Sequence, residues 1–288
     1  PLRRQRQMCI RDRIPISGGW IKNADFLEKA SGISLKYKFR MNEWENPLRA
    51  AVQAYKNVGI DLIPDGIALP EKADEVTKSG CLKIRGLNIN RDPTFKSPED
   101  IVTKYVQSLP SPKDLKESFE FEREYEGFTR KTKEAQDELG DDMLWMPQAD
   151  PIGFHLGLDR FGYKNYLLAL MRHKDSMARY FEYWGELARL HNEVMAAAII
   201  EENLDSPCVM VGSDICGNHG PMVPPKLLDE IYFPHVKRAI EPLQRKKIKI
   251  IWHCDGNITP IFNSLLNLEV DGFQGFQEEN GVDFPKIM

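Results

Sequence analysis

The segment Ile250–Asn257 carries the side chains whose types and spacing best suit chemistry. His253 and Asp255 lie two residues apart, directly after an apolar run that ends at Trp252. Residues two apart on a strand share a face, so these two side chains can converge on one atom. A ring nitrogen and a carboxylate in that arrangement suit a metal-ligand pair or an acid–base pair. The D-G-N sequence equally fits an ordinary strand-to-helix turn, in which Asp255 only caps the following helix.

Similar polar residues follow other apolar runs. Strands are expected at 60–64, 143–146, 208–211, 248–252 and 272–276, and helices at 47–58, 97–106, 112–139, 163–202, 224–247 and 259–268. Strands that alternate with helices form parallel sheets, and the carboxyl ends of parallel strands share one rim. The polar residues expected at that rim are Asp65, Gln148, Asp150, Asp214, His253, Asp255 and Glu279.

The alternation of strands and helices predicts an α/β fold of the (β/α)8 barrel type, with a doubly wound sheet as the alternative. No G-x-G-x-x-G motif follows the first expected strand, so dinucleotide binding has no support. Only five or six strands are counted, whereas a full barrel has eight. We therefore expect an incomplete barrel that lacks its last βα units, with the strand at 272–276 near its open edge. Such an edge exposes unpaired backbone groups, so poor solubility is also expected.

Composition narrows the class of protein. The 288 residues carry a formal net charge of -4, which gives no support for binding to nucleic acid or to a membrane surface. No apolar stretch approaches the roughly 20 residues that span a bilayer. The five cysteines show no C-x-x-C spacing and are expected to be reduced thiols of a cytoplasmic protein.

The first thirteen residues stand apart from the rest of the chain. The stretch Arg3–Arg13 matches the translation of an adapter used in sequencing libraries. We expect residues 1–13 to be a non-native leader, of which Arg3–Arg11 packs against nothing, and residues 14–288 to form one barrel domain, truncated at its C-terminus.

Two motifs near the C-terminus carry a family resemblance. They are G-S-D-I-C-G-N-H-G-P-M-V-P-P-K from Gly212, and I-I-W-H-C-D-G-N followed by V-D-G-F-Q-G-F-Q-E-E-N-G-V-D. The region Cys208–Ile287 thereby resembles the uroporphyrinogen decarboxylase superfamily, which implies a (β/α)8 barrel. That superfamily includes porphyrinogen decarboxylases and cobamide-dependent methyltransferases. The decarboxylases carry an M-R-Q-A-G-R segment after the first strand, whereas this chain has I-S-G-G-W-I-K-N without arginine.

The missing arginines argue against a decarboxylase, so the resemblance favours a corrinoid-linked methyltransferase. The coenzyme M methyltransferases of that superfamily hold zinc with His-x-Cys and a later cysteine. Here His253 matches the histidine, Asp255 occupies the cysteine position, and the later ligand is expected beyond Met288. An aspartate in place of a metal-binding cysteine favours transfer of a methyl group from a small methoxylated or methylated substrate to a corrinoid protein. Catalytic roles are expected for Asp214, His253 and Asp255. Substrate contacts are expected for Gln148, His219, Asn257 and Glu279. The alternatives are a tetrapyrrole decarboxylase and a non-enzymatic module that binds a corrinoid or a tetrapyrrole.

Overall fold

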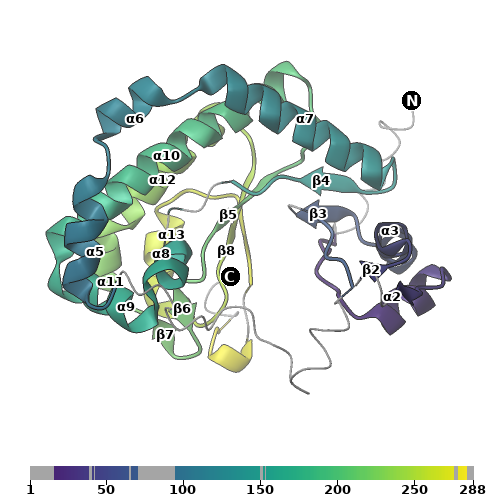
Figure 1. Cartoon of the computed structure of the whole chain (residues 1–288), viewed down its shortest axis with the longest axis horizontal. Coiled ribbons are helices and arrows are strands. Elements are labelled where there is room, and N and C mark those ends of the chain that lie inside the picture. Colours follow the sequence, from purple (N-terminus) through teal and green to yellow (C-terminus); the bar gives the residue numbers. More distant parts are fainter. Residues whose placement is uncertain are drawn as a thin grey trace. The chain divides into compact units, whose positions relative to one another are not determined.

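The computed structural model describes residues 16–38, 41, 43–64, 66–70, 95–149, 152, 154–275 and 278–283 (Figure 1). The expected leader, Asp65 and Asp150 lie outside the described residues. The chain divides into two compact units. The first comprises Pro1–Arg85, Thr129–Gln148 and Leu204–Pro207, and the second comprises Gly86–Phe128, Ala149–Asn203 and Cys208–Met288.

The first unit contains a parallel strand pair. β3 (Leu62–Pro64) pairs with β4 (Leu144–Met146), and Ser17 forms a further parallel bridge to Leu62. β1 (Tyr37–Lys38) and β2 (Glu43–Trp44) form a short antiparallel pair. Helices α2 (Ala24–Ser31) and α3 (Pro47–Val58) complete this unit, and each ends at a glycine in the left-handed region. α7 (Phe121–Leu139) begins in the second unit and ends in the first.

The second unit contains a three-stranded parallel sheet in the order β5-β8-β9. These strands are β5 (Val209–Gly212), β8 (Ile250–His253) and β9 (Gly272–Gln274). β8 is central. Among the described strands, β9 lies at an edge of the sheet. A short antiparallel hairpin of β6 (Cys216–Gly217) and β7 (Gly220–Pro221) follows β5.

Helices make up most of the second unit. Its helical elements are α5 (Pro98–Lys104), η1 (Val106–Ser108), α6 (Pro112–Ser118), α8 (Phe154–Phe161), α9 (Tyr163–Arg172), α10 (Lys174–Glu201), α11 (Pro225–Ile231), α12 (Phe233–Arg245), η2 (Thr259–Ile261), α13 (Phe262–Leu266) and η3 (Glu278–Asn280). The expected mixed α/β class with parallel strands is therefore confirmed. No closed barrel is found among the strands that the described residues form.

Helices α10 and α12 lie side by side (Figure 1). They approach closely at Gly185, where an added Cβ would lie 2.8 Å from Cβ of His235. The almost fully buried Glu186 accepts hydrogen bonds from Arg189 of its own helix and pairs with Arg238 of α12, whose Nη2 lies 2.8 Å from its Oε2. Close packing and a shared buried charge therefore join the two helices.

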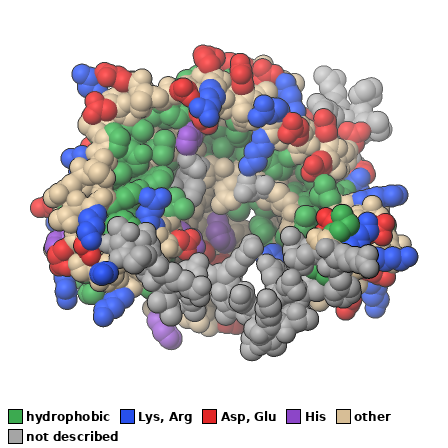
Figure 2. Space-filling view, in the orientation of Figure 1, with side chains coloured by type: hydrophobic (Ala, Val, Ile, Leu, Met, Phe, Trp, Pro, Cys, Tyr) green, Lys and Arg blue, Asp and Glu red, His purple; other side chains and the backbone are tan. Residues whose placement is uncertain are grey.

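The exposed surface of the long helices is strongly charged. Acidic and basic side chains gather over α7 at the top of the view (Figure 2). The acidic run at 120–126 lies on this solvated surface, as the charge pattern predicts for an outward-facing helix. Among the described residues, no helix is both long enough and apolar enough to cross a membrane.

Candidate metal centre

The pairing of β5 with β8 places the candidate ligands at one edge of the sheet. Gly212 lies opposite His253 in the parallel register. Gly212 has a φ of 136°, and an added Cβ would lie 2.0 Å from the carbonyl oxygen of His253. Only glycine permits this approach. The close contact brings Asp214, two residues after Gly212, beside the end of β8.

Three side chains converge at this edge. One ligand atom from each of Asp214, His253 and Asp255 lies within 4.8 Å of the other two. Nε2 of His253 lies 3.4 Å from Oδ1 of Asp214, and the backbone N–H of Asp255 donates to the same oxygen at 2.9 Å. His253 and Asp214 are partly buried, whereas Asp255 is exposed. The cluster therefore offers one nitrogen and two carboxylates, and it opens to solvent on the Asp255 side.

The charges of the three groups depend on one another. The hydrogen bond with Asp214 raises the pKa of His253 to about 9, despite an opposing effect of burial. The same bond is the main cause that holds the pKa of Asp214 below its usual range. Burial, and then the charge of Asp214, raise the pKa of Asp255. The two carboxylates repel each other, and a divalent cation bound between them and the imidazole would offset that repulsion.

Gln274 fixes the orientation of the His253 ring. Oε1 of Gln274 contacts Nδ1 of His253, and the two residues lie opposite each other in the β8–β9 register. Nδ1–H therefore donates to the amide oxygen, which leaves Nε2 to face Asp214. Sequence reasoning missed Gln274. Its only sequence signal is a polar residue at the end of an apolar strand, next to the strand that carries the histidine.

The segment after Asp255 packs tightly on the β6–β7 hairpin. Gly256 has a φ of 88°, and an added Cβ would lie 2.7 Å from the carbonyl oxygen of Gly217. The backbone N–H of Asn257 donates to that carbonyl at 2.9 Å. Oδ1 of Asn257 accepts from the N–H of Thr259 at 3.0 Å, so this side chain closes the turn that leads into η2.

The other residues expected to contact substrate do not share in this cluster. His219 is exposed in the turn between β6 and β7. Glu279 is exposed in η3, and no hydrogen bond or ion pair within the described residues joins it to the three ligands. Gln148 is exposed just after β4 in the first unit. The substrate contacts expected for these residues, and for Asn257, therefore remain predictions.

Two aromatic residues near Asp214 were not expected from the sequence. The hydrogen bond from His253 is the largest cause that lowers the pKa of Asp214. The charge of His155, at the start of α8, lowers it by a smaller amount. Burial and then the Asp214 charge raise the pKa of Tyr163, whose hydroxyl donates to Sδ of Met222 at 3.1 Å. Both residues lie at helix starts and not directly after strands, so the strand-end pattern did not indicate them.

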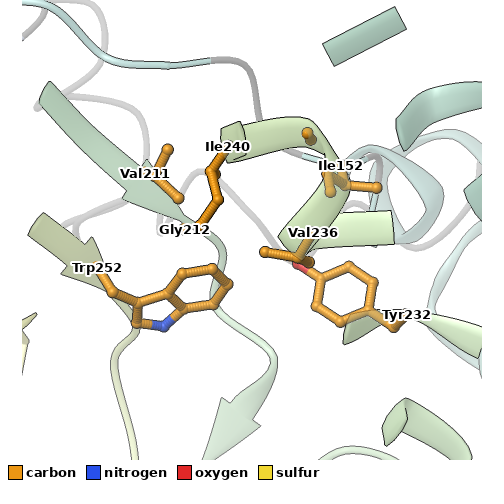
Figure 3. A pocket seen from close by; sticks show the side chains of 8 residues that line it. Ile152, Val211, Gly212, Tyr232, Val236, Ile240 and Trp252 are labelled. Carbon is orange, nitrogen blue, oxygen red and sulfur yellow. The ribbon is translucent and has the colours of Figure 1, made fainter. Parts of the chain in front are cut away.

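A small cavity lies beside the sheet. Trp252 and Tyr232 flank it, and Val211, Gly212 and Ile240 also line it (Figure 3). Trp252 precedes His253 on β8, so the two side chains point to opposite faces of the strand. The cavity volume is about 10 Å³, which is the lower limit for one water molecule. We therefore assign it to the packing of β5 and β8 against α12 and not to a substrate site.

Comparison with known proteins shows a similarity of fold to one solved structure and no match by sequence. The sequence matches no protein-family model and no curated protein. The chain is similar in fold to a methyltransferase from Methanosarcina mazei. The TM-score is 0.51 at 13% sequence identity, and the likeness covers 91% of this chain and 71% of that chain. At this identity the likeness concerns the fold alone.

Proposed function

We propose that this protein is a zinc-dependent methyltransferase with the (β/α)8 barrel of the uroporphyrinogen decarboxylase superfamily. In this proposal, Asp214, His253 and Asp255 hold the metal. The methyl donor is a small methoxylated or methylated compound, and the acceptor is a corrinoid carried by a partner protein. The observation that carries the proposal is the convergence of three ligand atoms from two neighbouring strand ends.

The donor set fits zinc. Zinc binds imidazole nitrogen and carboxylate oxygen, and catalytic sites commonly use three protein ligands with a fourth position left open. Two carboxylates balance the charge of a divalent ion, and Gln274 already turns Nε2 of His253 towards Asp214. Zinc, when bound, supplies Lewis acidity that stabilises negative charge on a leaving oxygen. Two oxygen ligands also make a harder centre than the thiolates of the family motif, which favours an oxygen-bound methyl donor.

The residues around the metal would have separate roles. Gln274 holds the histidine tautomer through Nδ1–H, as an outer hydrogen-bond partner does for most metal-bound histidines. The backbone N–H of Asp255 keeps Oδ1 of Asp214 in place. Asp255 is exposed, so the substrate would approach from its side. The fold likeness to a methyltransferase supports the proposed reaction class only by analogy.

The direct contact between His253 and Asp214 favours a second candidate. In a metal-independent decarboxylase, the same pair would hold a proton for transfer to the carbon that loses carbon dioxide. The metal dependence of the reaction separates this candidate from the first.

Removing a ligand is expected to slow zinc-dependent methyl transfer strongly. The full chain with one equivalent of zinc would be mixed with free cob(I)alamin and a small methoxylated benzoate or methanol, and methylcobalamin would be followed by its absorption. We expect His253→Ala and Asp214→Asn to slow the reaction at least about a hundredfold, because metal stabilisation of a leaving group contributes several kcal/mol. Asp229→Asn is the control, because Asp229 accepts from the Ser264 hydroxyl and is not one of the three candidate ligands.

A second experiment removes the metal with a chelator and leaves the ligands in place. Methyl transfer that persists after chelation, and that is unchanged in His253→Ala, would refute the zinc-dependent proposal. Release of carbon dioxide from a porphyrinogen by the metal-free protein would support the second candidate.

A further inference from the structure

An open cleft in the first unit shares no residue with the candidate metal centre. Its volume is about 510 Å³, within the range of roughly 300–1,000 Å³ that is usual for small-molecule sites. The described residues that line it belong to β1, β2, the start of α3 and the segment before residue 71. They are Lys38, Glu43, Trp44, Glu45, Asn46, Pro47, Leu69 and Pro70. The cleft is therefore large enough for a small organic molecule and has no part in the proposed reaction.

The charged side chains of the cleft lie on one face of the β1–β2 pair. Lys38 lies opposite Glu43 in the antiparallel register. The N–H of Glu45 donates to the carbonyl of Lys36 at 2.9 Å, so the pairing continues past β2. Residues that are opposite each other or two apart share a face, which places both carboxylates on the side of Lys38. Nζ of Lys38 lies 3.9 Å from Oε1 of Glu45. Within the described part of the chain, Glu43 has no ion pair or hydrogen bond, so one carboxylate charge is left uncompensated.

Apolar and amide groups complete the lining of the cleft. Leu69 is 46% exposed, and a ligand that covers it would remove apolar surface from water. The N–H of Ala68 donates to the carbonyl of Gly19 at 2.6 Å, and Pro70 is buried, so both neighbours of Leu69 are held in place. Asn46, the N-cap of α3, has a φ of 54° and makes no capping hydrogen bond through its side chain. Its amide therefore remains available to a ligand.

We propose that this cleft binds a small organic cation, in which an ammonium group is attached to an apolar body. The ammonium group would compensate the charge of Glu43 through a charge-assisted hydrogen bond, and the apolar body would cover Leu69. An anion of the same shape is disfavoured, because the two carboxylates of the cleft outnumber the single ammonium of Lys38. The carboxylates are exposed, so their contribution is modest, and a dissociation constant on the order of 1 mM is expected.

Three probes of similar shape and different charge test this inference. They are 2-phenylethylammonium, the neutral 3-phenylpropan-1-ol and the anion 3-phenylpropionate. Each is titrated into the full chain without added metal, and binding is followed by NMR at the indole N–H of Trp44, which is assigned by its loss in Trp44→Phe. We expect the ammonium to bind at least about threefold more tightly than the alcohol, which is the effect of one exposed ion pair. The carboxylate probe should bind most weakly.

Two variants of the cleft and one control complete the experiment. Glu43→Gln should reduce the preference for the ammonium over the alcohol by about threefold. Leu69→Lys should weaken ammonium binding by about tenfold or more, because it adds a like charge and removes an apolar contact. Glu117→Gln should change nothing, since this exposed carboxylate lies on α6, outside the cleft. Equal binding of the ammonium and the alcohol, an unchanged preference in Glu43→Gln, or no binding of the ammonium to the wild type would overturn the proposal.

Discussion

Replacing Gly212 by alanine is expected to destabilise the protein by about 4 kcal/mol and to remove the candidate metal centre. The new Cβ would lie 2.0 Å from the His253 carbonyl oxygen, at a φ of 136°. Backbone strain at such a position costs about 1–3 kcal/mol, and overpacking costs about 1–3 kcal/mol more. Relief of the clash must separate β5 from β8 and so move Asp214 away from His253. Urea denaturation measures the stability, and zinc titration measures the site.

Gly217→Ala is the matched control for this change. Gly217 lies in the neighbouring hairpin, its φ is not positive, and an added Cβ would meet nothing within 4 Å. The control should retain wild-type stability. If Gly212→Ala were equally stable and bound zinc normally, the close β5–β8 approach described here would be wrong.

Glu186→Ala is expected to cost about 3 kcal/mol, the low end for breaking a buried ion pair, because Arg189 keeps its ion pair with Glu193 at 2.9 Å. Glu186 is 3% exposed, and Arg189 binds both of its carboxylate oxygens at 2.8 and 3.0 Å. The Arg189 side chain is only 14% exposed, so water cannot fully replace the lost carboxylate. Thermal and urea unfolding of the variant would measure the loss.

An exposed pair on α12 provides the comparison for Glu186. Glu241 lies 3.3 Å from Arg245, and both side chains are more than half exposed. Glu241→Ala should cost less than about 1 kcal/mol, since surface ion pairs contribute little. Equal losses in the two variants would mean that burial of Glu186 does not set the strength of its ion pairs.

The strands of the second unit were predictable because their signal is local. The apolar runs expected at 208–211 and 248–252 correspond to β5 and β8, shifted by one or two residues. Helix boundaries were less predictable. The helix expected at 163–202 is interrupted at His173, which contacts Glu99 at 3.3 Å. The helix expected at 224–247 is interrupted at Tyr232, shortly before Pro234, whose ring lacks the N–H that a continuous helix needs.

The candidate site was only partly predictable because its assembly depends on strand register. The spacing of His253 and Asp255 on one strand is a local property and was recognised. The approach of Asp214 within hydrogen-bonding reach of Asp255 depends on the contact between Gly212 and β8, which no local pattern encodes. The position of Gln274 beside His253 depends in the same way on the β8–β9 register. The family resemblance implied a further ligand beyond Met288, which stays a prediction. Asp214, expected at the same rim, lies with His253 and Asp255 in the structure.

X-ray absorption at the zinc edge, on the full chain with one equivalent of zinc, tests the proposed centre most directly. We predict one imidazole and otherwise oxygen ligands at about 2.0–2.2 Å, with no sulfur at about 2.3 Å. The imidazole signal should vanish in His253→Ala. A zinc–sulfur distance near 2.3 Å would instead place the metal on cysteine thiolates. That result, or an imidazole signal that persists without His253, would contradict a centre built from Asp214, His253 and Asp255.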